Sequence, residues 1–78
     1  MRRSRIRRLP IHSYRRMFLI ADRMVREEIA FRKEGGADLE GVYGVVSWRI
    51  HADPFTLRRF KDDASLYDCL NASFACRI

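Results

Sequence analysis

The segment that determines the fold is residues 42–60, Val-Tyr-Gly-Val-Val-Ser-Trp-Arg-Ile-His-Ala-Asp-Pro-Phe-Thr-Leu-Arg-Arg-Phe. Within residues 42–51, the side chains of Val42, Val46, Trp48 and Ile50 would point to one side of a strand. The sequence therefore predicts a strand over residues 42–51. Because a single strand leaves its backbone groups unpaired, we expect residues 55–60 to pair with it as a hairpin.

The same stretch has a second interpretation. Asp53 can cap a helix that begins at Pro54, since proline suits the first helical position. Leu57, Phe60, Ala64, Tyr67 and Phe74 would then follow a rough helical spacing. We favour the hairpin and keep a mostly α fold with one strand as the alternative.

Helices are predicted on both sides of this stretch. Residues 13–34 have an apolar half, a possible N-cap at Ser13 and a stop at Gly35-Gly36. Residues 63–76 have apolar positions at helical spacing and acidic side chains at their start. The predicted fold class is therefore α+β, with an arm followed by helix, small antiparallel β-hairpin and helix (αββα).

Charge divides the chain into a basic N-terminal arm, residues 1–10, and a single small domain, residues 11–78. The whole chain has 16 Lys and Arg against 10 Asp and Glu, a net charge of +6. Without residues 1–9 the balance is 11 against 10, or +1. The arm carries five arginines: Arg2, Arg3, Arg5, Arg7 and Arg8.

This arginine spacing favours a polyanion as the partner. The guanidinium group is a planar fork that binds phosphate oxygens bidentately. Arg15 and Arg16 would extend the basic track onto a helix start, where free backbone N–H groups also favour an anion. We expect these two and the five arm arginines to bind nucleic acid, with an acidic protein surface as the alternative. If five arginines met duplex phosphates, log K would fall with log salt at a slope of roughly −4 to −5.

Other residues are candidates for contact with a protein partner or a second copy of the chain. Glu28 lies near the middle of the apolar arc of the first helix, where either Arg32 at i+4 or a partner could pair with it. Tyr43 and Arg49 would lie on the second face of the predicted strand, which leaves a free sheet edge. Residues 58–61, which include Arg58, Arg59 and Lys61, are interpreted as a solvated surface.

Several classes of function are disfavoured. The sequence contains no serine–histidine–acid signature, glycine-rich phosphate loop or His-Glu-x-x-His motif, so we expect no enzyme. Cys69 and Cys76 form no disulfide framework, and no short ligand spacing predicts a metal or cofactor site. No apolar run approaches the ~18 residues of a membrane span, and no secretory signal is visible. We expect an intracellular, cytoplasmic protein. Because residues 1–21 are arginine-rich and free of acid, an organelle is the alternative.

The sequence thus predicts a non-enzymatic binding module whose arm engages nucleic acid, as a ribonucleoprotein subunit or a nucleic-acid-associated regulator. One alternative is a small inhibitor or adaptor, of the kind that mobile elements encode, which acts through protein contact. The other is a structural subunit of a large organellar assembly.

Overall fold

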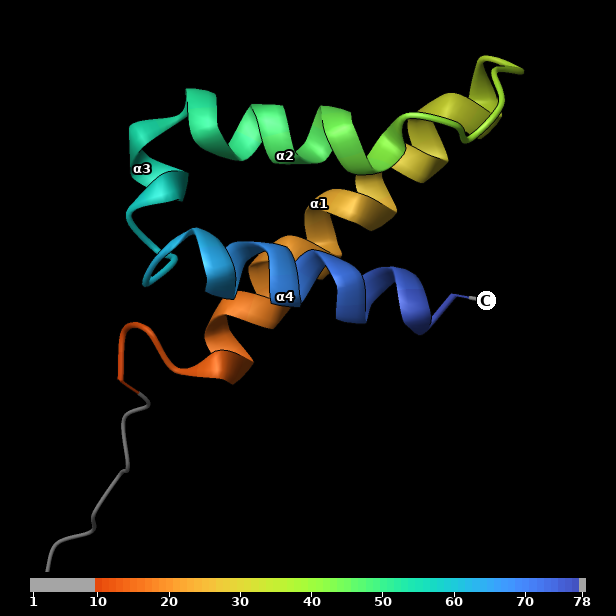
Figure 1. Cartoon of the computed structure of the whole chain (residues 1–78). Coiled ribbons are helices and arrows are strands. Elements are labelled where there is room, and N and C mark those ends of the chain that lie inside the picture. The colour runs from red at the N-terminus through yellow and green to blue at the C-terminus, as the bar shows by residue number, and fades with distance from the viewer. Residues whose placement is uncertain (1–9, 78) are drawn as a thin grey trace, which may run out of the picture.

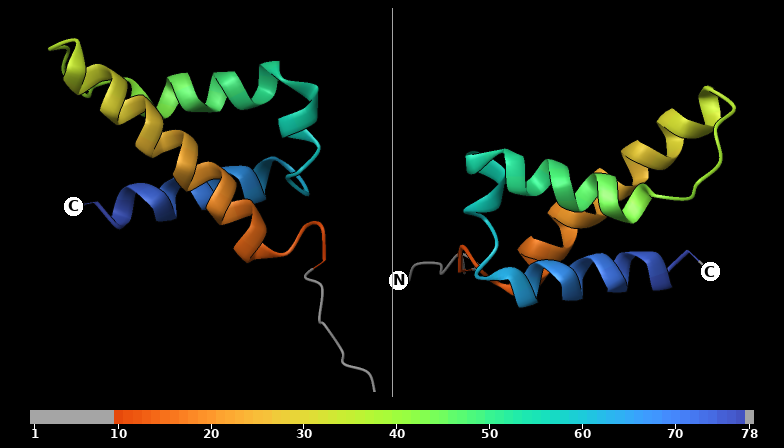
Figure 2. Two further views of the ribbon diagram at one scale, coloured as in Figure 1. Left: turned by 180° about the vertical axis from the view of Figure 1, so that it is seen from behind. Right: turned by 45° about the horizontal axis from the view of Figure 1, so that its top comes forward.

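A computed structural model describes residues 10–77, and this part of the chain contains helices and no strand (Figure 1). The helices are α1 (Tyr14–Glu34), α2 (Val42–Ala52), α3 (Pro54–Leu57) and α4 (Asp63–Ala75). Helix α1 crosses α2 and α4 on one side, and these two lie together in a second layer (Figures 1 and 2). The predicted α+β fold is therefore wrong. The described residues fit the mostly α alternative, but without the strand that it retained.

Helix α1 forms as its sequence predicts. The Ser13 side chain accepts a hydrogen bond from the backbone N–H of Arg16 at 3.1 Å, which caps the helix start. The helix ends at the paired glycines, where Gly36 adopts a φ of +77° that disfavours other residues. Three i,i+4 ion pairs lie along the helix: Arg23–Glu27, Arg26–Asp22 and Arg32–Glu28, the last of which was one of the alternatives predicted for Glu28.

Helix α2 replaces the predicted strand because the spacing of its apolar residues fits a helix as well as a strand. Val42, Val46 and Ile50 are four residues apart, which puts them on one helical face, and each is at most 1 % exposed. Trp48, which a strand would bury with them, is 70 % exposed. A helix pairs its own backbone groups, whereas a two-stranded hairpin is barely stable in water. Packing on α1 thus overrides the strand preference of valine and isoleucine.

Helix α3 contradicts the predicted hairpin and agrees with the rival interpretation. Asp53 Oδ1 accepts a hydrogen bond from the backbone N–H of Phe55 at 3.1 Å, and Pro54 begins the helix. Asp53 Oδ2 accepts a second hydrogen bond from the Thr56 hydroxyl at 2.8 Å. With both carboxylate oxygens in use, Asp53 fixes the corner between α2 and α3 and excludes strand pairing there.

Helix α4 begins at the predicted position, where Asp62 accepts a hydrogen bond from the backbone N–H of Ser65 at 2.8 Å. It packs more extensively on α1 than any other helix does. The core between the two layers draws on α1, α2, α4 and the turn before α4: Met17, Ala21, Val25, Val42, Val46, Ile50, Phe60, Leu66, Cys69 and Leu70.

A partly buried polar network joins α1 and α4 beside this core. Asp22 Oδ1 accepts hydrogen bonds from the Ser73 hydroxyl at 2.8 Å and from Arg77 Nη1 at 2.7 Å. Asp22 Oδ2 pairs with Arg26 at 3.1 Å. Ser73 is fully buried, so this network satisfies a polar group that would otherwise destabilise the interface.

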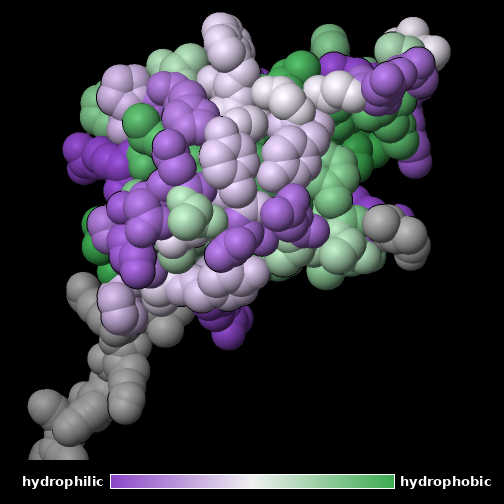
Figure 3. All heavy atoms as spheres, in the orientation of Figure 1, coloured by the Kyte–Doolittle hydropathy of each residue, from purple (hydrophilic) through white to green (hydrophobic). Residues whose placement is uncertain are grey.

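Figure 3 shows the face on which α4 lies. Hydrophilic side chains gather over α3 and the start of α4, and hydrophobic ones lie over the C-terminal half of α1 (Figure 3). The depressions described next are lined by residues of α1, α2 and α3 and of the turn after α3. Helix α1 faces the viewer when the molecule is seen from behind (Figure 2, left).

Candidate functional site

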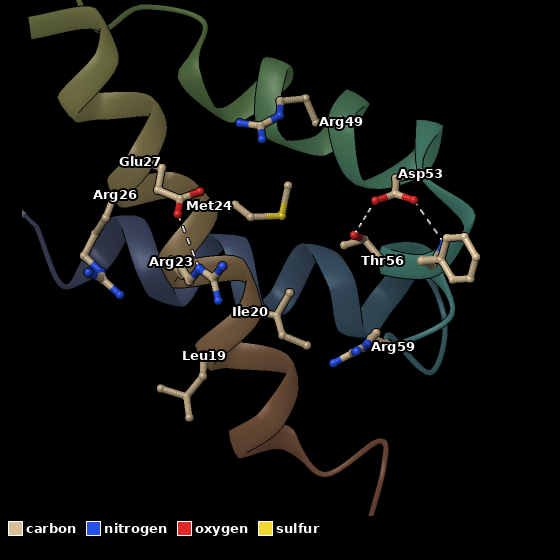
Figure 4. A pocket seen from close by; sticks show the side chains of 11 residues that line it. Leu19, Ile20, Arg23, Met24, Arg26, Glu27, Arg49, Asp53, Thr56 and Arg59 are labelled. Carbon is tan, nitrogen blue, oxygen red and sulfur yellow. Dashed lines mark hydrogen bonds and ion pairs between the residues drawn. The ribbon is translucent and has the colours of Figure 1, made fainter. Parts of the chain in front are cut away.

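A groove runs between α1 and α3, because these two helices do not approach each other within 8 Å between Cα atoms. It consists of two adjoining depressions of about 580 and 420 Å³, which share Leu19, Ile20 and Arg59. Helix α2 closes its upper side through Arg49 (Figure 4). We call the two depressions together the arginine groove.

Two contacts bring the start of α1 to the turn that follows α3. His12 Nε2 donates a hydrogen bond to the carbonyl oxygen of Arg58 at 2.9 Å, since a carbonyl can only accept. The backbone N–H of Lys61 lies 3.4 Å from the Met17 sulfur. These contacts place Arg16 beside the 58–59 segment, although more than forty residues separate them in sequence.

The floor of the arginine groove is apolar. Ile20 and Met24 point from α1 toward α2 and α3, and Leu19 lies at the lower edge (Figure 4). Phe55 projects from α3, and 72 % of the residue is exposed. The Arg58 guanidinium carbon lies 5.7 Å from the centre of this ring, within the range of a cation–π contact.

The lining of the groove is rich in positive charge. It includes six arginines: Arg16, Arg23, Arg26, Arg49, Arg58 and Arg59. Three of these pair with carboxylates, Arg23 with Glu27, Arg26 with Asp22 and Arg49 with Glu28. Arg16, Arg58 and Arg59 form no ion pair with any residue from 10 to 77. These three exposed cations therefore converge without an internal counter-charge.

The acidic side chains of the groove have structural partners. Glu27 pairs with Arg23 at 3.3 Å, and Asp53 caps α3 through both oxygens. Neither carboxylate contacts the three unpaired arginines through a hydrogen bond or an ion pair. The groove is therefore positively charged over an apolar floor, an arrangement that suits an anion carrying flat apolar groups.

The predicted anion-binding residues fall into two groups. Arg2, Arg3, Arg5, Arg7 and Arg8 lie outside the described residues. Arg15 and Arg16 are both exposed in the first turn of α1, but only Arg16 lines the groove. The structure thus brings one predicted arginine together with two that the sequence had assigned to a solvated surface.

The predicted partner contacts have internal neighbours. Glu28 pairs with Arg32 at 3.0 Å and with Arg49 at 3.6 Å, and its side chain is 12 % exposed. Tyr43 stacks on Tyr67 with ring centres 6.4 Å apart, and burial raises the pKa of its hydroxyl. Of the three, only Arg49 also lines the groove. Contact of Glu28, Tyr43 and Arg49 with a partner stays a prediction.

Arg58 and Arg59 were not predicted as binding residues, because in the predicted strand their side chains would point to opposite faces. The signal that identifies them is Asp53-Pro54, which caps a short helix and leaves both arginines in the turn that follows. Their convergence with Arg16 depends on a contact distant in sequence, which no local pattern contains.

Within the described range, no group of three His, Cys, Asp or Glu side chains lies close enough to hold a metal ion. None of the helices between residues 10 and 77 combines the length and hydropathy needed to cross a membrane. No protein-family model matches the chain, and neither does any curated protein or solved structure with which it was compared.

Proposed function

We propose that this protein is a non-enzymatic module that binds the phosphate backbone of nucleic acid through the arginine groove and the N-terminal arm. The observation that carries the proposal is the convergence of Arg16, Arg58 and Arg59, which have no counter-charge among residues 10–77. Arg16 lies in the first turn of α1, six residues after Pro10, the last residue of the basic arm. The arm would therefore extend a track that the groove begins.

The energetics of the helix start support an anionic partner. The first turn of α1 contains Arg15 and Arg16 and no acidic residue. A cation at the positive end of a helix dipole costs about 0.3–1 kcal/mol at an exposed site. Arg58 and Arg59 add like charge beside this turn. A bound phosphate chain would offset both effects, whereas the acids of the groove are engaged elsewhere.

Two of the features on which the predicted alternative, an adaptor acting through protein contact, depended are not available in the structure of residues 10–77. Its interface relied on a free sheet edge, which residues 10–77 do not contain. It also relied on Glu28, whose carboxylate is held by two arginines of the same chain. The unpaired arginines favour nucleic acid because successive phosphates of one strand can contact several neighbouring cations at once.

Fluorescence anisotropy with labelled oligonucleotides of unrelated sequence, titrated at several salt concentrations, tests this function. We expect binding to every sequence and a linear fall of log K with log salt. Replacing Arg16, Arg58 and Arg59 together with glutamine removes three cations and should flatten the slope on duplex DNA by about 2–3. Replacing the five arm arginines with glutamine should flatten it further.

A matched pair of single variants controls for net charge. Arg59→Gln removes a cation from the groove, and Lys33→Gln removes one from the last turn of α1, outside the groove. Only Arg59→Gln should flatten the salt slope, by about 0.9. Equal effects of the two variants, or no binding by the unaltered chain, would overturn the proposed function.

A further inference from the structure

We propose that the arginine groove selects single-stranded over double-stranded nucleic acid, with Phe55 as the platform on which a base stacks. This inference rests on the proposed function and specifies the form of nucleic acid that the groove takes. Its starting point is the composition of the lining, in which an exposed aromatic ring and an apolar floor lie among arginines.

The apolar floor has no role in binding a duplex from outside. A duplex presents phosphates and sugars and keeps the faces of its bases stacked inside. Leu19, Ile20 and Met24 would gain nothing from those phosphates. A single strand presents both kinds of group, since its bases can leave the stack while its phosphates follow a basic surface. The alternation of apolar floor and arginine rim matches that chemistry.

Phe55 is exposed at the start of α3, at the edge of the groove. Its backbone N–H is fixed by Asp53 Oδ1 at 3.1 Å in the first turn of α3. The residue is 72 % exposed, and the Arg58 guanidinium carbon lies 5.7 Å from the centre of its ring. A base that stacks on the ring would thus have a guanidinium within reach of its phosphate. The larger depression, about 580 Å³, is within the usual range for small-ligand pockets and has room for a base.

The experiment compares two phenylalanines that are equally exposed but lie at different positions on the molecule. Phe55 and Phe31 are both 72 % exposed, but Phe31 lies near the C-terminal end of α1 and does not line the groove. Phe55→Ala, Phe55→Trp and Phe31→Ala are each titrated against a labelled single strand and the matching duplex. Oligothymidylate and oligouridylate serve as the DNA and RNA single strands. Far-UV circular dichroism checks that each variant retains its helices.

We expect the unaltered chain to bind a single strand more tightly than the duplex. Phe55→Ala should weaken single-strand binding by about 5- to 150-fold, the loss typical of one stacked base. Its salt slope should not change, because no charge is lost. Phe55→Trp should retain the affinity, Phe31→Ala should have no effect, and duplex binding should be the same for all three variants.

Different results overturn different claims. If Phe55→Ala binds the single strand as the unaltered chain does, or the duplex binds equally well, the single-strand inference is wrong, although the salt-dependent binding of the proposed function stands. If no oligonucleotide binds and an acidic peptide does, both fail. If Phe55→Ala loses single-strand binding and Phe55→Trp retains it, the result supports both the proposed function and the single-strand inference.

Discussion

Two glycines at and within α2 show how the effect of a single residue depends on its backbone conformation. Gly44 lies in the middle of α2, where glycine destabilises a helix relative to alanine. It is exposed, and a Cβ atom added there would meet no atom within 4 Å. Gly41, three residues earlier, is at the helix N-cap with a φ of +86°, which a residue with a side chain adopts only under strain. Gly44 therefore destabilises α2, whereas Gly41 permits the left-handed backbone at its start.

Gly44→Ala should stabilise the protein by about 0.5–1 kcal/mol, because it removes the entropic cost of glycine in a helix without a clash. Urea denaturation followed by circular dichroism measures the change. Gly41→Ala is the control and should destabilise by about 1–2 kcal/mol, the cost of a left-handed backbone for a residue with a Cβ atom. A destabilising Gly44→Ala would contradict the assignment of residues 42–52 to a helix.

At the scale of elements, the polar network of Asp22, Ser73 and Arg77 ties α1 to α4. Burial raises the pKa of the Asp22 carboxyl, but hydrogen bonds from Arg77, Ser73 and Arg26 outweigh it and hold the pKa below its usual value of 3.8. A carboxyl whose pKa is lowered by folding stabilises the folded state above its unfolded pKa. That contribution is lost as the pH falls through the folded pKa.

Asp22→Asn should therefore destabilise the protein at neutral pH by about 1–3 kcal/mol, because the buried Ser73 hydroxyl and the Arg77 guanidinium lose their charged acceptor. The difference from the unaltered chain should shrink as the pH falls below 3.8. Glu27→Gln breaks an exposed pair on the same helix, at 73 % and 54 % side-chain exposure, and should change stability by less than about 0.5 kcal/mol. Denaturant titration from pH 2 to pH 7 measures both. Equal effects of the two substitutions would exclude a special role for the network.

The elements also show what the sequence could predict. The bounds of α1 and α4 follow from caps and stops, Ser13, Gly36 and Asp62, which act locally and can be recognised in the sequence. The 42–51 stretch could not be assigned in this way, because valines and an isoleucine spaced by four also alternate with a period of two. Only the neighbouring apolar face of α1 decides between the two.

The candidate site shows the same limit. Arginine chemistry indicated an anion, and Arg16 lies in the groove as part of the predicted set. The contribution of Arg58 and Arg59 depends on the hydrogen bond from His12 to the carbonyl oxygen of Arg58, which joins residues 46 positions apart. A local pattern cannot contain a contact of that range.

The whole molecule is small, and a domain of this size buries only about 60 % of the surface its unfolded chain exposes. Its stability should therefore respond strongly to a ligand that binds only the folded state. A single-stranded oligonucleotide at about one hundred times its Kd stabilises the folded state by about 2.7 kcal/mol. For a domain of this length that corresponds to a rise in Tm of roughly 10–20 °C.

Differential scanning fluorimetry with and without the oligonucleotide measures this shift. The variant in which Arg16, Arg58 and Arg59 are glutamine should show a much smaller rise at the same ligand concentration. Lys33→Gln should show the full rise. The same rise in all three proteins would mean that the ligand stabilises the fold through a surface other than the groove.

The most extensive helix interface of the molecule joins α1 to α4, the first helix to the last. While the chain is being synthesised, Met17, Ala21 and Val25 remain without the neighbours Leu66, Cys69 and Leu70 until the segment up to Ser73 has left the ribosome. The α1–α4 interface therefore cannot form before α4 has been synthesised, and a nascent chain that stops before α4 presents an uncovered apolar stripe to chaperones and proteases.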